Sequence, residues 1–323
     1  MKAIRIHKFG PTEEVLQFEE VPVPEPSLGQ LLIKVEAASL NRADLGLRSG
    51  NYRIDPKDLP IIPGREFAGR VTKLGDGVNE FQAGQRVVAY TGTGGYAEYA
   101  AAKESEVRSL PDGVDAAAAA AMPTVFLTAW FGLMAEGKLK SGDWLLVQAG
   151  SSGVGNAAIQ IGKHAGAKVI TTTSSDDKSR RLRELGADAV IDYTRNDFVT
   201  EGMRATGNHG ADIVLEMIGG EVYQKSTEVL APDGRLVSIG GAFGKIPDTP
   251  PALTDGRKAS RFSITNYLSA HPEGFKQLDA LLQSVRDGKY QAVIDRSFPL
   301  AETRAAQRFL EGRDHFGKIV LIP

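Results

Sequence analysis

The sequence contains no cysteine among its 323 residues. This absence excludes disulfide bonds, thiolate catalysis and every zinc or iron–sulfur site that depends on cysteine ligands. Any redox chemistry must therefore come from a bound cofactor. An excess of one charge is also lacking, because 38 lysine and arginine residues are balanced by 40 aspartate and glutamate residues. Since no long run of one sign could follow a phosphate backbone, we expect no nucleic-acid partner.

Long hydrophobic runs are scarce as well. Residues 116–135 form one uncharged stretch of about the length that spans a bilayer. A block of six alanines and the polar or helix-breaking Pro123, Thr124 and Thr128 weaken its transfer into lipid. We therefore expect a buried helix and no membrane partner. The N-terminus lacks the apolar core and cleavage site of a signal peptide, so a cytoplasmic location is expected.

The pattern along the chain predicts two domains, in line with its length. Residues 2–103 contain short strands of alternating character separated by turn signals, which is typical of a compact, mostly β domain. The later sequence repeats apolar strand, glycine-rich turn and amphipathic helix, which predicts a doubly wound parallel sheet in an α/β fold. Its expected strands are residues 144–149, 168–173, 189–193, 212–217 and 235–239. We assign residues 1–120 and 262–323 to the first domain and 121–261 to the second.

The first turn of the second domain carries a glycine-rich motif. An apolar strand is followed by Gly150-Ser151-Ser152-Gly153-Val154-Gly155 and then by a helix through Ala165. In dinucleotide-binding folds such glycines let the backbone turn sharply and approach the pyrophosphate, which binds amides at the helix N-terminus. Ser152 replaces the middle glycine, so the motif alone is weak. Its place between a strand and a helix supports dinucleotide binding; the alternative is a tight turn without a ligand.

The end of the next strand indicates which nucleotide is bound. NAD-specific sites usually place a carboxylate at this strand tip, where it binds the adenosine ribose. Here the strand ends in Thr173-Ser174-Ser175, and Asp176 follows within the first turn of the next helix, where its charge suits the dipole. Lys178, Arg180 and Arg181 then supply cations. This favours NADPH over NADH, although the basic residues could also form an ordinary solvated helix face.

The chain resembles the medium-chain dehydrogenase/reductase superfamily over essentially its whole length. Zinc alcohol dehydrogenases of that superfamily use an early cysteine and a later histidine–glutamate pair as metal ligands. Here the cysteine is absent, and Arg65 precedes Glu66 where the histidine would stand. The four-cysteine structural zinc lobe is missing too. The closer resemblance is therefore to the zinc-independent, zeta-crystallin-like quinone oxidoreductase branch. It rests on Asn41, Asp44, Arg48-Ser49-Gly50, Tyr52, Pro63-Gly64, Glu66, Leu127-Thr128-Ala129, Gly153-Val154-Gly155, Lys178, Ile191-Asp192-Tyr193, Arg313 and Gly317.

The resemblance implies a fold and a site. The fold would combine a GroES-like catalytic domain with a Rossmann domain. The catalytic residues at the nicotinamide end would be Asn41, Tyr52 and Thr128, and no residue would bind a metal. The residues implied to bind the cofactor are Gly150, Ser152, Gly153, Val154 and Gly155 in the turn, Ser174, Lys178, Tyr193 and Arg313 around the 2′-phosphate, and Gly240 and Gly241 near the ring or pyrophosphate.

Several of these residues also have structural explanations. Asn41 could cap a helix, and Tyr52 could pack with a satisfied hydroxyl. Asp44 and Arg48, four residues apart, are interpreted as an ion pair rather than as catalytic groups. The five histidines lack the spacing of metal ligands.

The expected reaction is reduction of a quinone by NADPH in a cleft between the domains, without a metal. Asn41 or Tyr52 would stabilise negative charge on oxygen, and a hydroquinone anion would take its proton from solvent. Two alternatives stay open: reduction of the carbon–carbon bond of enones or alkenals, and an NADPH-binding structural role without catalysis. The sequence does not distinguish one-electron from two-electron reduction.

The segment Arg261 to Leu268 reads as a strand that could form the end of the second sheet. Sheet edges of this kind are commonly paired. The resemblance implies a homodimer through this edge strand.

Overall fold

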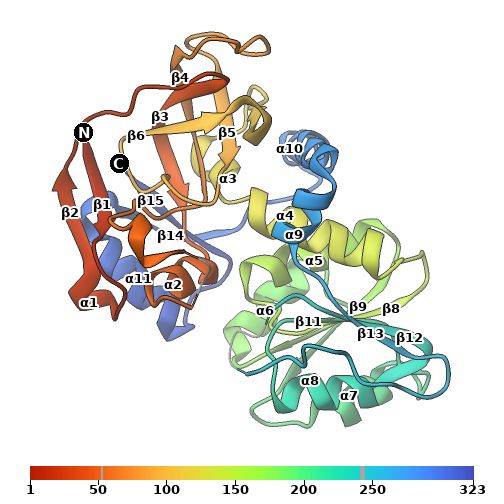
Figure 1. Ribbon diagram of the computed structural model, residues 1–323. Helices are drawn as coiled ribbons and strands as arrows, with labels where there is room; N and C mark the ends of the chain where they lie inside the picture. Colours follow the sequence, from red (N-terminus) through yellow and green to blue (C-terminus); the bar gives the residue numbers. More distant parts are fainter. Residues whose placement is uncertain (52–53, 241–243) are drawn as a thin grey trace. The chain divides into compact units, whose positions relative to one another are not determined.

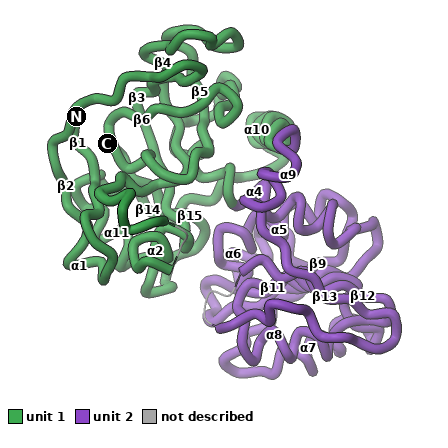
Figure 2. The backbone as a smooth tube through the Cα atoms, in the orientation of Figure 1, with its two compact units in different colours: residues 1–124, 275–323 green, residues 125–274 purple. Residues whose placement is uncertain are grey.

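A computed structural model describes residues 1–51, 54–240 and 244–323 (Figure 1). The chain forms two compact units (Figure 2). The first comprises Met1–Thr124 and Phe275–Pro323, and the second comprises Val125–Gly274. The second unit extends beyond the predicted end at residue 261, because the rings of Phe131 and Tyr267 lie 4.4 Å apart between centroids and keep the following helix with it.

The first unit is built on a seven-stranded sheet in the order β14-β15-β3-β4-β5-β7, with β6 paired to β3. Its pairs are antiparallel except for β14 with β15. The strands are β3 (Gln30–Ser39), β4 (Glu66–Leu74), β5 (Arg86–Tyr90), β6 (Tyr99–Lys103), β7 (Val107–Ser109), β14 (Ile294–Pro299) and β15 (Lys318–Ile322). A separate two-stranded sheet joins β1 (Lys2–Ile6) to β2 (Leu16–Glu20).

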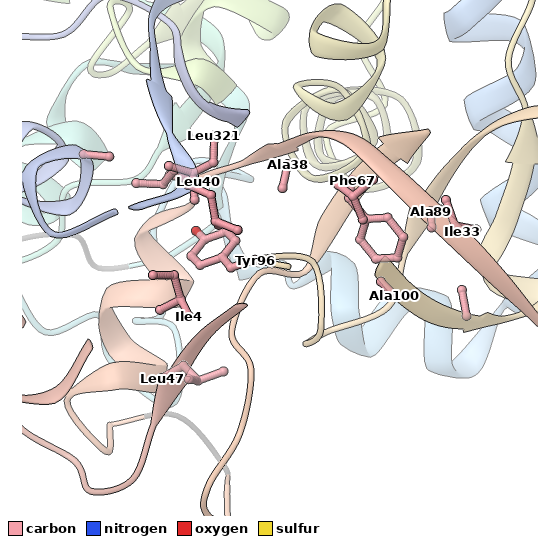
Figure 3. Packing of buried hydrophobic residues seen from close by; sticks show 14 of the residues in the cluster. Ile4, Ile33, Ala38, Leu40, Leu47, Phe67, Ala89, Tyr96, Ala100 and Leu321 are labelled. Atoms are coloured by element: carbon pink, nitrogen blue, oxygen red, sulfur yellow. The ribbon is translucent and has the colours of Figure 1, made fainter. Parts of the chain in front are cut away.

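Helices flank these sheets. They are α1 (Thr12–Val15), α2 (Arg42–Arg48), α3 (Ala116–Ala120), α10 (Gln277–Arg286) and α11 (Thr303–Gly312), with the short 3-10 turns η1 (Pro56–Asp58), η2 (Glu104–Glu106) and η5 (Leu300–Glu302). The 3-10 turn η4 (Pro272–Lys276) begins in the second unit and ends in the first. Buried apolar side chains from β1, β3, β4 and β15 form the core, which includes Ile4, Ile33, Phe67 and Leu321 (Figure 3). Tyr96 is fully buried in the same cluster.

The pairing of β15 with β3 brings the end of the chain to the start of α2. Val320 pairs with Ser39, and the Leu40 N–H donates to the carbonyl of Ile319 at 2.9 Å. Glu66, the first residue of β4, lies next to this junction because β4 pairs with β3 from Phe67 opposite Ala38. Residues from three strands far apart in the sequence therefore meet at one point.

The second unit contains a six-stranded parallel sheet in the order β10-β9-β8-β11-β12-β13 within the described residues. The strands are β8 (Trp144–Val147), β9 (Lys168–Thr173), β10 (Ala189–Asp192), β11 (Ala211–Glu216), β12 (Leu230–Ser238) and β13 (Lys258–Arg261). This order is that of a dinucleotide-binding fold, with a reversal between β8 and β11. The predicted α/β fold with a doubly wound sheet is confirmed.

Helices cover both faces of this sheet, with α5 and α6 on one face and α7 and α8 on the other (Figure 1). The helices are α4 (Pro123–Trp130), the π-helical turn η3 (Phe131–Glu136), α5 (Gly153–His164), α6 (Asp176–Glu184), α7 (Phe198–Ala205), α8 (Glu221–Glu228) and α9 (Ile264–Ala270). The stretch 116–135 therefore forms several short helices rather than one. Among the described residues, no helix has both the length and the apolar character needed to cross a membrane.

The predicted strand from Arg261 to Leu268 is wrong. The edge strand β13 ends at Arg261, and α9 begins three residues later. Ser263 caps this helix, because its hydroxyl accepts a hydrogen bond from the Asn266 N–H at 3.4 Å. The β-branched and aromatic residues that favoured a strand are thus overridden by an N-cap and by packing of Tyr267 on the ring of Phe131.

Candidate functional site

The turn between β8 and α5 is shaped by two close approaches of the backbone. A Cβ atom on Gly150 would lie 2.1 Å from the hydroxyl of Thr171, and one on Gly155 would lie 2.4 Å from the carbonyl oxygen of Ala149. Neither distance is sterically possible, so both positions require glycine. The two outer glycines of the motif thus bring α5 tightly against the first strands of the sheet, as a dinucleotide-binding turn requires.

Ser152 takes the place of the middle glycine and serves as the N-cap of α5. Its hydroxyl accepts a hydrogen bond from the Gly155 N–H at 3.0 Å and donates to the sulfur of Met217 at 3.3 Å. The N–H groups of Gly153 and Val154, in the same first turn, have no acceptor within the described protein. These two free donors, at the positive end of a twelve-residue helix, can bind an anionic group.

The carboxyl ends of β9 and β10 carry the other predicted cofactor residues of the second unit. Ser174 directly follows β9, Lys178 lies in the first turn of α6, and Tyr193 directly follows β10. The N–H of Tyr193 donates to the carbonyl of Thr173 at 3.1 Å, while its side chain is 55% exposed. All three therefore lie at the strand ends where ligands bind in doubly wound folds.

The two carboxylates that follow β9 are engaged by arginines. Asp176 forms a bidentate pair with Arg195, with nitrogen–oxygen distances of 2.9 and 3.1 Å. Asp177 pairs with Arg180 at 2.6 Å. The cap on α6 is Ser175, whose hydroxyl accepts from the Lys178 N–H at 3.3 Å. No carboxylate therefore follows β9 directly in the sequence, and the next two pair with arginines, while Asp192 at the end of the neighbouring β10 lies opposite Thr173.

Glu216 ends β11 at the same edge, and the sequence reasoning did not identify it. Its carboxylate is buried and accepts hydrogen bonds from the N–H groups of Ile218 at 2.5 Å and Gly219 at 2.8 Å. Burial raises the pKa of Glu216 above its ordinary value, and these hydrogen bonds only partly oppose the rise. An acidic residue that ends an otherwise apolar strand was the available signal. Its contacts assign it to shaping the turn after β11.

A second polar cluster lies in the first unit, around Glu66. One carboxylate oxygen of Glu66 accepts hydrogen bonds from the Asn41 amide at 2.7 Å, from the Lys318 ammonium at 2.8 Å and from the Ser39 hydroxyl. The other oxygen accepts from the Thr124 N–H at 2.6 Å. Burial alone would raise the pKa of Glu66, but the charge of Lys318 and these hydrogen bonds hold it below its usual value.

Asp44 forms the second buried carboxylate of the first unit. It accepts hydrogen bonds from the Asn41 N–H and from the Tyr96 hydroxyl, each at 2.8 Å, and lies 3.7 Å from the Arg65 guanidinium. Burial raises the pKa of Asp44, and Arg65, Tyr96 and Asn41 oppose this rise without cancelling it. Burial and the neighbouring Asp44 carboxylate raise the pKa of Tyr96 well above its ordinary value.

The predicted ion pair between Asp44 and Arg48 is wrong. Arg48 is buried and pairs instead with Glu311 at 2.8 Å, while Asp44 points to Tyr96 and Arg65. Both residues are still structural, as expected, but each has a partner distant in the sequence. Helical spacing alone did not identify these partners, because the sheet pairings of the first unit bring them together.

The remaining predicted residues fall in different parts of the chain. Asn41 is the N-cap residue of α2 in the first unit, and Thr128 is buried in α4 of the second unit. Arg313 follows α11 in the first unit with a left-handed backbone. Gly240 follows β12 with a backbone φ of +142°, a conformation that favours glycine although the space around it is open. Tyr52 and Gly241 lie outside the described residues.

Comparison with known proteins gives consistent matches. The family model described as "Alcohol dehydrogenase GroES-like domain" matches residues 27–112, and the one described as "Zinc-binding dehydrogenase" matches residues 185–321. Quinone oxidoreductase from Homo sapiens is 32% identical over 325 residues, covering 100% of this chain and 98% of that protein. The structure of Escherichia coli quinone oxidoreductase complexed with NADPH is similar with a TM-score of 0.92, at 28% identity and over 100% of both chains.

A further relative is much longer. A segment of a phenolphthiocerol/phthiocerol polyketide synthase from Mycobacterium tuberculosis is 33% identical over 312 residues. The match covers 95% of this chain but 14% of that protein.

One matching description implies a zinc ion, and the residues of the first unit do not fit one. Among the described residues, no three His, Cys, Asp or Glu side chains lie together in a group that could hold a metal. The Glu66 carboxylate already accepts hydrogen bonds from four donors, and one of these is the Lys318 ammonium, whose positive charge repels a second cation. Arg65, which precedes Glu66, carries a second positive charge. This donor set disfavours a divalent metal.

Proposed function

Because the chain belongs to the zinc-independent quinone oxidoreductase branch of the medium-chain dehydrogenase/reductase superfamily, we propose that it transfers hydride from NADPH to quinones without a metal. It is an NADPH-dependent oxidoreductase, as the family resemblance of its sequence predicted. The observation that carries the assignment is the glycine turn, in which two positions exclude any side chain and two helix N–H groups lack an acceptor within the described chain.

When bound, NADPH supplies the hydride, and this chain supplies binding and charge stabilisation. The N–H groups of Gly153 and Val154 would hold the pyrophosphate at the N-terminus of α5. Lys178, Ser174 and Tyr193 would bind the 2′-phosphate, since the two carboxylates that follow β9 in the sequence are paired with arginines. Arg313 of the first unit is proposed as a further phosphate ligand.

The acceptor is proposed to be a quinone or a similar electron-poor carbonyl compound. It gains a hydride, which carries two electrons, so that negative charge develops on one of its oxygens. A fixed N–H donor would stabilise that charge, and the oxygen would then take a proton from solvent. Asn41 is the described residue proposed for this role, with Tyr52 and Thr128 as further catalytic candidates.

Reduction of an enone or alkenal double bond is the second candidate. The observation behind it is the similarity to a segment of a polyketide synthase. That protein is not named as a quinone oxidoreductase, so similarity of this degree extends to proteins whose names do not indicate a quinone acceptor. This reaction needs a proton at the α-carbon in addition to the hydride.

The experiment compares acceptors and nucleotides side by side. Loss of the nicotinamide absorbance is followed with a simple ortho-quinone and with an unsaturated ketone, using NADPH or NADH. We expect faster turnover with the quinone and a strong preference for NADPH. The variant Lys178→Ala should lose roughly tenfold in NADPH affinity, as for one charged hydrogen bond, while NADH affinity stays unchanged. Faster turnover of the ketone would favour the second candidate.

We also propose that the protein forms a homodimer through β13. Within the described residues this strand pairs with β12 alone, so its other side carries unpaired backbone groups. A short edge strand of this kind can pair with its copy in a second chain.

A further inference from the structure

The side-chain amide of Asn41 lies between a buried cation and a buried anion. The Lys318 ammonium donates to its oxygen at 2.8 Å, and its nitrogen donates to the Glu66 carboxylate at 2.7 Å. The opposite orientation would place the NH₂ group against the ammonium and the oxygen against the carboxylate. The two charges therefore permit one orientation of the amide.

The cation itself is rigidly held. The three N–H groups of Lys318 have three acceptors: the carbonyl of Leu40 at 2.7 Å, the Asn41 oxygen and the Glu66 carboxylate, each at 2.8 Å. Lys318 is 5% exposed and Glu66 is fully buried. An ammonium with all donors satisfied inside the protein has little freedom to move. Lys318 and Glu66 thus hold the Asn41 side-chain amide in one orientation.

The Asn41 amide nitrogen has a second hydrogen. Glu66 accepts the first, and no other acceptor for this nitrogen occurs among the described residues. Contact with an ammonium at the oxygen and a carboxylate at the nitrogen polarises the amide, because hydrogen bonds in a chain strengthen one another. Asn41 is 6% exposed, so a small part of this residue reaches the surface of the buried cluster.

We infer that Lys318 and Glu66 are positioning residues that aim the second Asn41 N–H at the acceptor oxygen on which negative charge develops. This inference rests on the proposed function. It assigns the last strand of the chain a part in the reaction, since Lys318 begins β15. A donor fixed in advance stabilises developing charge without having to reorganise during the reaction.

A double-mutant cycle tests the inference. Asn41→Ala and Lys318→Met should each lower kcat for quinone reduction by about a hundredfold, as expected for loss of one fixed donor, with the NADPH dissociation constant unchanged. The double variant should be no slower than Asn41→Ala alone, because Lys318 acts through Asn41. Lys318→Arg, which keeps the charge, should restore part of the rate. Losses that multiply in the double variant would overturn the positioning role.

A control removes another, more exposed ion pair of the first unit. Arg108 donates to Asp279 at 2.8 Å, remote in sequence from the cluster. Arg108→Met should lower stability and leave kcat unchanged, so an equal loss of kcat in this control would overturn the inference. If Lys318→Met fails to fold because Glu66 is left as an uncompensated buried charge, Lys318→Met combined with Glu66→Gln removes both charges together and replaces it in the cycle.

A measurement without substrate separates this inference from the proposed function. The Asn41 side-chain amide is identified by NMR as the NH₂ signal that Asn41→Ala lacks. We expect its shift and its hydrogen-exchange rate to change in the Lys318 variant but not in Arg108→Met. An unchanged signal in the Lys318 variant would contradict the claim that Lys318 fixes the orientation of the Asn41 amide. A wild-type protein that reduces no quinone would overturn the proposed function and the donor role with it, even if the amide signal moved as expected.

Discussion

At the scale of single residues, the first unit depends on buried charges that compensate one another. Lys318 and Glu66 are both buried, and each carries hydrogen bonds to neutral groups as well as to its partner. Removing one member of such a pair leaves an uncompensated charge, which costs more than removing both. The pair therefore resists single substitutions, although a well-packed apolar pair could be equally stable there.

Acid should reveal the contribution of Glu66. Its folded-state pKa is lowered from 4.5, so the stability that ionised Glu66 contributes is present above that value and is lost as the pH falls through the folded-state pKa. Glu66→Gln should cost about 3 kcal/mol of unfolding free energy near neutral pH. The gap between wild type and variant should narrow on acidification, as measured by urea unfolding across a pH series. Asp44 is present in wild type and in Glu66→Gln, so its own contribution to the pH dependence of stability does not enter the difference between them. If the difference in unfolding free energy stayed constant down to acidic pH, this would contradict the assignment of a negative charge to Glu66.

At the scale of elements, the sequence predicted the parallel strands well. Strand β9 has the predicted bounds, and β8, β10 and β11 end within two residues of theirs. A buried parallel strand is rich in apolar and β-branched residues, as in Val169 to Thr173 of β9, so local pattern suffices to find it. The segment after Arg261 misled the prediction, because its strand propensity gave way to the Ser263 cap and to packing of Tyr267.

The candidate site was predictable only where it depends on local sequence. The glycine turn was found from the local pattern. Ser174, Lys178 and Tyr193, which the family resemblance implied, follow strand ends or begin the next helix, and their roles stay predictions. The partners of Asn41 could not, because Glu66 and Lys318 reach it through pairings between β3, β4 and β15. Such contacts between distant segments leave no periodicity in the sequence.

The glycine turn gives a prediction at this scale. Gly155→Ala would place a Cβ atom 2.4 Å from a backbone oxygen, so α5 must shift away from β8. We expect a loss of about 1–3 kcal/mol of stability and weaker NADPH binding, measured by thermal unfolding and fluorescence titration. The matched control is Gly132→Ala, whose Cβ would lie 3.4 Å from the nearest atom, an ordinary contact. Unchanged NADPH binding in Gly155→Ala would contradict the proposal that the pyrophosphate binds at the N-terminus of α5.

At the scale of the whole molecule, the unpaired side of β13 is the edge through which we propose that two chains form a dimer. The Phe262 N–H donates to the carbonyl of Ser238 at 2.7 Å, on the side of β12. Since N–H groups alternate along a strand, those of Ala259 and Arg261 point away from β12. The outer side of this four-residue strand therefore offers donors and acceptors to a second chain.

Sedimentation velocity should therefore show particles of two chains. Ala259→Pro removes an outward N–H and leaves the pairing with β12 intact, because proline is tolerated at sheet edges where its nitrogen faces outward. This variant should sediment as a single chain with its NADPH binding preserved.

The matched control lies on the opposite edge of the same sheet. The Tyr193 N–H donates to Thr173 of β9, so the N–H of Val190, three residues earlier in β10, points outward by the same alternation. Val190→Pro thus makes the equivalent change and should remain a dimer. If wild type sediments as a single chain, the proposed dimer is ruled out. If Ala259→Pro still sediments as a dimer, the interface does not involve β13.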